Sequence, residues 1–108
     1  MIHSSRRQLG KKQADKKIKT LNGASTVVTK NPTRMKNTKK RYEETGGEVP
    51  KGYDVDHMID LQLGGKDLPS NMKPLDSSVN RSLGIQIHQS IKDLPEGTTI
   101  LKFKIVDP

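Results

Sequence analysis

The clearest hydrophobic pattern lies near the C-terminal end of the chain. Apolar residues recur there at every fourth position, namely Val79, Leu83, Ile87 and Ile91. This spacing places one apolar stripe along a helix from about residue 78 to about residue 93. Asp76-Ser77-Ser78, just before it, are residue types that cap a helix N-terminus. Leu94-Pro95-Glu96-Gly97 is expected to end the helix.

Strand-like patterns lie on both sides of this helix. Residues 52–57 alternate apolar and polar side chains, as a half-buried strand does, and Gly64-Gly65 makes a sharp break soon after. Residues 71–75 are short and contain Pro74, which predicts an edge strand or an extended loop. Residues 98–106 alternate again and predict a closing strand.

The first part of the chain has a weaker pattern. Residues 1–20 are rich in Lys, Gln and Ser, and their apolar positions are too sparse for a continuous stripe, so a frayed helix or a disordered arm is expected. Residues 25–29 are β-branched and predict a short strand, and Asn31-Pro32-Thr33 predicts a turn. Residues 33–44 predict a charged helix that Gly46-Gly47 ends.

Together these elements predict a small α+β fold in a single domain, since a chain of 108 residues rarely divides further. Within it, residues 1–45 are expected to form a basic N-terminal arm, partly disordered or helical. Residues 46–108 are expected to hold the structured core and the site. With 30% hydrophobic residues, that core is modest, and a bound ion or partner would add stability.

Charge is concentrated in the first half of the chain. The formal charge is +8, and residues 1–50 hold 13 Lys and Arg against 4 acids, whereas residues 51–108 hold 7 against 8. Such polarity suggests an electrostatic surface for a phosphate backbone. The lack of cysteine excludes disulfides and thiolate zinc sites, so any metal must be held by oxygen or imidazole. Neither a membrane-spanning run nor a secretory signal is visible, and no small-molecule cofactor is expected.

Residues 55–84 carry the candidate chemistry. Asp56-His57 ends a predicted strand, Asn71 follows His57 by fourteen residues, and Asn80 comes nine later on the first turn of the predicted helix. This layout resembles the HNH and endonuclease-seven superfamily, the ββα-metal nucleases, in the variant with Asn in place of the last His. The resemblance implies a ββα-metal core, to which the charge and the alternation of the sequence add a basic N-terminal extension and a C-terminal strand.

The roles that this resemblance implies agree with the chemistry of phosphodiester hydrolysis, which needs an activated water and a cation to neutralise developing charge. His57 would be the general base. Asp56 and Asn80 would give oxygen ligands to one ion, and hard oxygen donors suit Mg²⁺ or Mn²⁺. In the family, the residue equivalent to Asn71 braces the loop and orients the base through backbone hydrogen bonds.

Within the superfamily, the phrase L-Q-L-G-G-x-D-x-x-x-N-M-x-P-L-D-S-S-V-N-R-S-L-G looks like the C-terminal nuclease toxin domains of Rhs-type bacterial polymorphic toxins. The likeness covers roughly residues 41–100. It implies a toxin that cuts DNA with low sequence specificity, is delivered by a dedicated system, acts in the target-cell cytoplasm, and is countered by an immunity protein. Many members carry a third His or Cys pairs for structural zinc, and this chain has neither.

Residues around the core constellation carry weaker expectations. Arg81 could clamp a phosphate or simply be an exposed helix residue. His88 lies about 12 Å beyond Asn80 along the helix, too far to share an ion, and is expected to be structural or a distant substrate contact. Asp54 and Asp60 are either supporting acids or solvated ones. The nucleic-acid contacts expected are Arg81, Lys39, Lys40, Arg41 and Lys73.

Two other readings stay open. Taken singly, Asp56 and His57 could be a surface pair, Asn71 a turn residue and Asn80 a solvated helix position, and only the joint pattern favours a nuclease. A non-catalytic basic nucleic-acid-binding module would explain the charge equally well. The same site could also act on RNA.

Overall fold

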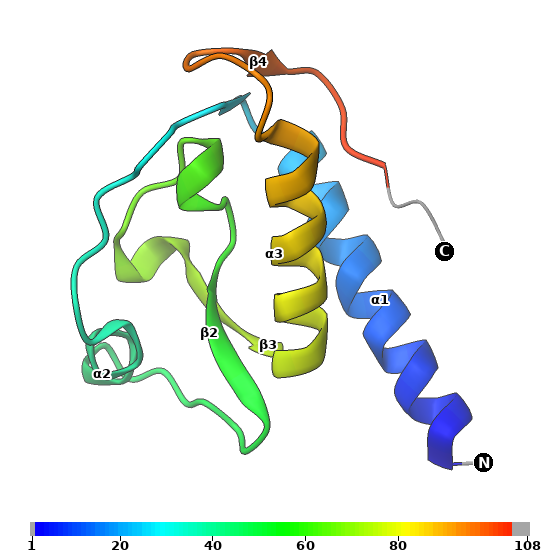
Figure 1. Ribbon diagram of the computed structural model, residues 1–108. Coiled ribbons are helices and arrows are strands. Elements are labelled where there is room, and N and C mark those ends of the chain that lie inside the picture. Colours follow the sequence, from blue (N-terminus) through cyan, green and yellow to red (C-terminus); the bar gives the residue numbers. More distant parts are fainter. Residues whose placement is uncertain (1, 105–108) are drawn as a thin grey trace.

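The computed structural model describes residues 2–104, with side chains from Gly10 onward, as three α-helices and two antiparallel sheets of two strands each (Figure 1). The elements are α1 (Ile2–Asn22), β1 (Thr26–Val27), α2 (Thr38–Glu44), β2 (Tyr53–His57), β3 (Met72–Asp76), α3 (Ser77–Ile91) and β4 (Thr99–Ile100). Two single turns of 3₁₀ helix, η1 (Leu61–Leu63) and η2 (Pro69–Asn71), lie between β2 and β3. The prediction of a small α+β fold is confirmed.

The central unit is the antiparallel pair β2–β3 followed directly by α3. Tyr53 pairs with Asp76 at one end of the ladder and His57 with Met72 at the other. The Asp76 carboxylate accepts hydrogen bonds from the backbone N–H groups of Ser78 and Val79, so the last residue of β3 caps α3. This cap turns the chain from strand to helix without a loop.

The apolar stripe predicted on α3 is confirmed. Leu83, Ile87 and Ile91 are buried on one face of the helix, and Ile87 and Ile91 join a core that also contains Leu63. Both strands of the β2–β3 pair contact α3. This packing fixes the first turn of α3 relative to the end of β2.

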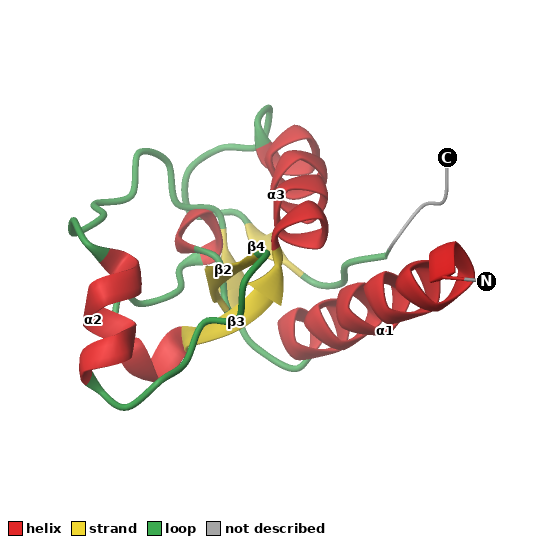
Figure 2. Ribbon diagram, turned by 90° about the horizontal axis from the view of Figure 1, so that it is seen from below, coloured by secondary structure: helices red, strands yellow, loops and turns green. Residues whose placement is uncertain are grey.

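Helix α1 forms part of the same core. Leu21 is 1% exposed and packs in the core cluster with Val28 and Leu63. Figures 1 and 2 show α1 alongside α3, and a Cβ on Gly10 would lie 3.4 Å from a methyl group of Val79. Of the two expectations for residues 1–20, the helix is the one observed. The core therefore draws on both the basic N-terminal part and the part after residue 45.

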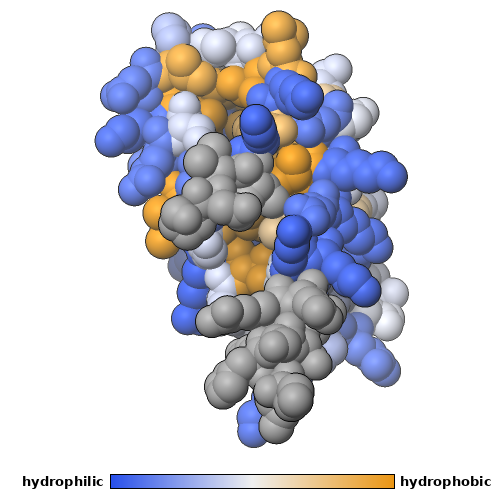
Figure 3. Space-filling model, turned by 90° about the vertical axis from the view of Figure 1, so that its right-hand side faces the viewer, coloured by the Kyte–Doolittle hydropathy of each residue, from blue (hydrophilic) through white to orange (hydrophobic). Residues whose placement is uncertain are grey.

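The face of the molecule that includes α1 is largely hydrophilic, with apolar patches between the charged groups (Figure 3). Among the side chains of α1 from Gly10 onward, Leu21 is the one apolar residue that is fully buried, which explains why its sequence shows no continuous apolar stripe. Within residues 2–104, no helix combines the length and apolar composition needed to cross a membrane.

The predicted strand at residues 98–106 is wrong in its length. Only Thr99–Ile100 forms β4, paired with β1, and Leu101 beyond it is 90% exposed. Strand β1 offers only two residues for pairing, so the alternation that continues past Ile100 finds no ladder partner. Residues 105 and 106 lie outside the described part.

The charged helix predicted at residues 33–44 begins later, at Thr38. Asn37, just before it, has a left-handed backbone with φ 62°, which separates the helix from the preceding segment. The helix ends at Glu44, before the positive-φ Gly46, as expected. The segment from Thr29 to Asn37 runs without regular structure between β1 and α2.

Candidate active site

His57 is the last residue of β2 and is only 5% exposed. Its Nε2 lies 2.8 Å from Oδ1 of Asp67, a residue of the loop between η1 and η2. Asp67 is itself fixed by the backbone N–H of Met35 at 2.6 Å and by the guanidinium of Arg41. The imidazole is thus anchored to a carboxylate that two other segments of the chain hold in place.

The charge on Asp67 determines which nitrogen of His57 carries a proton. The hydrogen bond from Met35, with further hydrogen bonds from His57 and Arg41, lowers the pKa of Asp67 to about 2 against the opposing effect of burial. A carboxylate only accepts hydrogen bonds, so the neutral imidazole carries its hydrogen on Nε2. The lone pair then lies on Nδ1, the arrangement of a general base oriented by a carboxylate.

The low pKa of Asp67 makes a prediction about acid stability. Because this pKa is about 2 in the fold and 3.8 ordinarily, the carboxylate stabilises the fold above about pH 4, and that contribution is lost as the pH falls toward 2. Asp67→Asn should therefore flatten the decline of unfolding free energy between pH 4 and pH 2, measured by urea unfolding. Asp93→Asn, at an exposed carboxylate, should follow the parent. An Asp67→Asn curve as steep as the parent's would contradict the prediction.

Asn71 closes the loop that follows His57. Its Oδ1 accepts from the backbone N–H of Ile59 at 3.0 Å, and its Nδ2 donates to the carbonyls of Ile59 and Lys66, each at 2.9 Å. Its own carbonyl accepts from the N–H of Met58 at 2.7 Å. Gly65 packs so tightly against this loop that a Cβ there would lie 1.7 Å from the Ile59 oxygen. These contacts are of the bracing kind expected of Asn71, and its catalytic role stays a prediction.

The carboxylate of Asp56 is bound by a lysine from α1. Lys17 Nζ lies 2.8 Å and 2.6 Å from the two oxygens of Asp56, 3.0 Å from the carbonyl of His57 and 2.7 Å from Oδ1 of Asp60. Lys17 is 7% exposed. Sequence reasoning missed this contact, and its only signal is that Lys17 stands four residues before the buried Leu21, on the same helix face.

One ammonium group thus faces two carboxylates. The three N–H groups of Lys17 are directed at Asp56 and at the His57 carbonyl, which leaves the buried Asp60 Oδ1 in close contact but without an aligned hydrogen bond. Burial raises the pKa of Asp56, and the neighbouring Lys17 opposes this rise. The cluster therefore carries an excess of negative charge when both acids are ionised.

Asn80, on the first turn of α3, contacts a different carboxylate. Its Nδ2 donates to Oδ2 of Asp54 at 2.9 Å, and the Ser77 hydroxyl donates to Oδ1 at 2.8 Å. The hydrogen bond from Asn80 is the main cause that lowers the pKa of Asp54, with help from Ser77 and Arg81 and against burial. Arg81 is 76% exposed in its side chain, 4.0 Å from Asp54. Asp54 is thus hydrogen-bonded to Asn80 and Ser77, and its role as a supporting acid stays a prediction.

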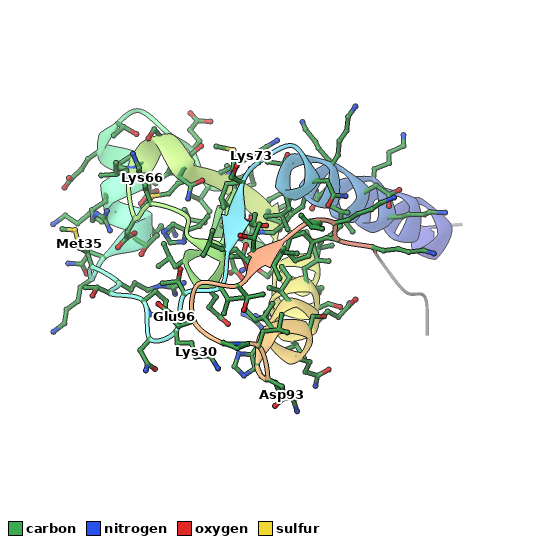
Figure 4. The ribbon with its side chains drawn as sticks, turned by 90° about the horizontal axis from the view of Figure 1, so that it is seen from above. Lys30, Met35, Lys66, Lys73, Asp93 and Glu96 are labelled. Atoms are coloured by element: carbon green, nitrogen blue, oxygen red, sulfur yellow. The ribbon has the colours of Figure 1, made fainter. Side chains whose placement is uncertain are left out.

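A cavity of about 670 Å³ lies beside these residues. From the predicted constellation it is lined by Asp56, His57 and Asn80. It is also lined by three cations, Lys30, Arg34 and Lys92. Lys30 lies beside Glu96, whose carboxylate accepts from the Lys30 backbone N–H (Figure 4).

Lys30 and Arg34 come from the segment between β1 and α2, Lys92 follows α3, and none of them gave a local sequence signal. The predicted nucleic-acid contacts lie elsewhere. Lys39 and Lys40 are exposed on α2, whereas Arg41 is held against Asp67. Lys73 and Arg81 are exposed on β3 and α3.

The two other histidines are placed differently. His88 lines the cavity, with its Nδ1 3.1 Å from Gln62 Oε1. His3 lies among the residues whose side chains are outside the described part.

Comparisons of the chain with protein-family models, with curated proteins and with solved structures gave no match. The geometry of this site and the sequence pattern are therefore the basis for inferring its function.

The donor set suits a hard divalent cation in its chemistry, since Asp56 and Asn80 offer oxygen ligands beside one cavity. The oxygens of Asp56 are already bound, because Lys17 contacts both of them, whereas Asn80 binds Asp54 through its amide nitrogen and not through its oxygen. Among the residues whose side chains are described, no three His, Asp or Glu side chains are arranged as a group that could hold a metal ion. An ion at Asp56 must therefore compete with the ammonium of Lys17.

Proposed function

We propose that the protein is a metal-dependent endonuclease of the HNH type, with a ββα-metal core, which hydrolyses phosphodiester bonds of DNA. The observation that carries the proposal is that Asp56, His57 and Asn80 line one cavity at the junction of an antiparallel strand pair and the helix that follows it. This is the order of elements that the resemblance to the ββα-metal nucleases implies, and its residue types can supply a base and oxygen ligands for phosphodiester hydrolysis.

His57 is the proposed general base. Asp67 holds its Nε2–H, so Nδ1 accepts a proton from water, and Asn71 keeps the loop that carries Asp67 closed against the end of β2. Imidazole is the side chain most often used for this kind of proton transfer. In this proposal Asp67 is a positioning residue, since it acts through His57.

Asp56 and Asn80 would hold Mg²⁺ or Mn²⁺, which when bound neutralises charge on the phosphate and the leaving oxygen. For this, Lys17 must give up its contacts with Asp56, whereas Asn80 binds Asp54 through its amide nitrogen, which leaves its amide oxygen outside that hydrogen bond. The excess of carboxylate over ammonium around Lys17 favours a divalent cation in that exchange.

Lys30, Arg34 and Lys92 give the cavity a positive rim suited to a phosphate backbone. Such contacts read charge and not base identity, so low sequence specificity is expected. The role as a toxin delivered into a target cell, and an acidic immunity protein that covers the basic surface, follow from the resemblance and belong to the same proposal.

The deciding experiment is incubation of the purified protein with supercoiled plasmid in Mg²⁺, in Mn²⁺ and in EDTA. Nicked or linear DNA is expected in either metal and not in EDTA. Parallel digestion of a structured RNA shows whether RNA is the better substrate. Plasmid and RNA that both stay intact in either metal would overturn the nuclease proposal.

A second candidate is a nucleic-acid-binding module without catalysis. The observation that favours it is the ion pair of Lys17 with Asp56, which satisfies the carboxylate without any metal. Salt-sensitive DNA binding, together with intact plasmid and no effect of divalent cations on stability, would favour this candidate over the nuclease.

A further inference from the structure

A second cavity, of about 410 Å³, lies between α1 and the β2–β3 pair. Helix α1 contributes Gln13, Lys16 and Lys17 to its lining, and the two strands contribute Tyr53, Asp56 and Lys73. Asp56 lines both this cavity and the one beside His57. The contact of α1 with β3 therefore builds a second pocket, which shares Asp56 with the candidate active site but not His57 or Asn80.

The charges in this cavity are unbalanced. Lys17 is neutralised by Asp56 and Asp60. Lys16 and Lys73 have no carboxylate within ion-pair distance among the side chains from Gly10 to Lys104. Both line the same cavity, and the proximity of Lys16, together with burial, lowers the pKa of Lys73. Two uncompensated cations are thus held together across α1 and β3.

The fold enforces this closeness. Lys73 stands opposite Asp56 in the β2–β3 ladder, and Lys16 precedes Lys17, whose ammonium is bound to Asp56. The ion pair that fixes α1 to Asp56 thus carries Lys16 to the side of Lys73. Figure 4 shows Lys73 near the end of α1 that leads into β1. Without an anion, this arrangement is repulsive.

Tyr53 supplies a third donor to the same cavity. Its hydroxyl oxygen accepts a hydrogen bond from Gln13 Nε2 at 3.2 Å, and the Gln13 oxygen in turn accepts from the backbone N–H of Asp76. Because Gln13 is oriented in this way as the donor, the hydroxyl hydrogen of Tyr53 stays available to an acceptor. Two ammonium groups and one oriented hydroxyl match the several acceptor oxygens of a phosphate.

We propose that this second cavity binds a phosphate group through the ammonium groups of Lys16 and Lys73 and the hydroxyl of Tyr53. The phosphate is either the phosphodiester of a nucleic-acid strand or a free phosphate or phosphomonoester, and the recognition chemistry is shared. The proposal does not depend on catalysis at His57, because the residues that bind the phosphate are different from the candidate catalytic ones.

The test is an NMR titration of the whole chain with inorganic phosphate, following the lysine side-chain signals. In the parent protein, the signals of Lys73 should shift and saturate. Lys16→Gln/Lys73→Gln should weaken phosphate binding by about tenfold or more, and Tyr53→Phe by a smaller factor. All three positions are at least partly exposed, so these variants are expected to fold.

The matched control is Lys36→Gln/Lys51→Gln, which removes the same charge from two exposed positions that line neither cavity. This control should bind phosphate as the parent does. Equal weakening in both double variants would indicate diffuse charge attraction and overturn the site, as would the absence of a saturable shift at Lys73.

Competition with inorganic phosphate identifies the source of the phosphate group. A short DNA strand without terminal phosphates that displaces inorganic phosphate from Lys73 supports the site and identifies a phosphodiester. Displacement by a phosphomonoester alone supports the site and identifies a free phosphate. Phosphate binding by a protein that leaves plasmid intact would separate this site from the nuclease proposal.

Discussion

His57→Ala is expected to slow plasmid cleavage by about 10² to 10⁴-fold, the usual contribution of a positioned general base. The reason is that His57 is the imidazole at the end of β2 whose tautomer a neighbouring carboxylate fixes. The measurement is the initial rate of conversion of supercoiled to nicked DNA at saturating Mg²⁺. DNA binding, measured without metal, should change little, because the proposed phosphate contacts are lysines and arginines.

His88→Ala is the matched control for this substitution. His88 lines the same cavity but is exposed and contacts Gln62, so its loss should alter the rate only slightly. Because His57 is buried, a second variant, His57→Asn, whose side chain is closer in size to histidine than alanine is, is measured as well. Thermal unfolding checks that both variants are folded. A folded His57 variant that cuts as fast as the parent would rule out the proposed base.

Lys17→Met is expected to lower the free energy of unfolding by about 3–5 kcal/mol in EDTA, because it removes one partner of a buried ion pair. Asp56 and Asp60 would then face each other without a counter-ion. Mn²⁺ or Mg²⁺ should restore part of this loss, since a cation that binds only the folded state stabilises it. Thermal unfolding with and without the metal, in variant and parent, measures both effects.

Two controls define what the Lys17 result means. Lys19→Met removes an exposed lysine of α1 and should change stability little. Lys17→Met/Asp56→Asn should lose the response to the cation, because it removes the proposed ligand. If Mn²⁺ raises the unfolding temperature of Lys17→Met no more than that of the parent, Asp56 is not a metal ligand, and the binding module without catalysis becomes the better account.

The sequence predicted the β2–β3–α3 unit well because its signals are local. Alternation over residues 52–57, the cap at Asp76 and the four-residue spacing of Leu83, Ile87 and Ile91 each act over a few residues. The end of β4 was predicted less well, since a strand continues only where a partner strand exists. The alternating residues themselves do not specify how long the partner strand is.

The candidate site was predictable in its residue types but not in its contacts. The spacing of Asp56, His57, Asn71 and Asn80 indicated which side chains to examine. The partners of these residues come from distant segments: Lys17 is 39 residues before Asp56, and Asn80 is 26 residues after its partner Asp54. Long-range partners of this kind depend on how the helices pack, which no local pattern encodes.

The ion pair between α1 and Asp56 has a consequence for the evolution of the chain. A basic N-terminal extension is usually free to lengthen, shorten or exchange its charges, because only its overall potential matters. Here one lysine in it is tied to the carboxylate at the centre of the site, and a leucine four residues later fills the core. Selection on the site therefore extends into the helix, and the two halves must change together.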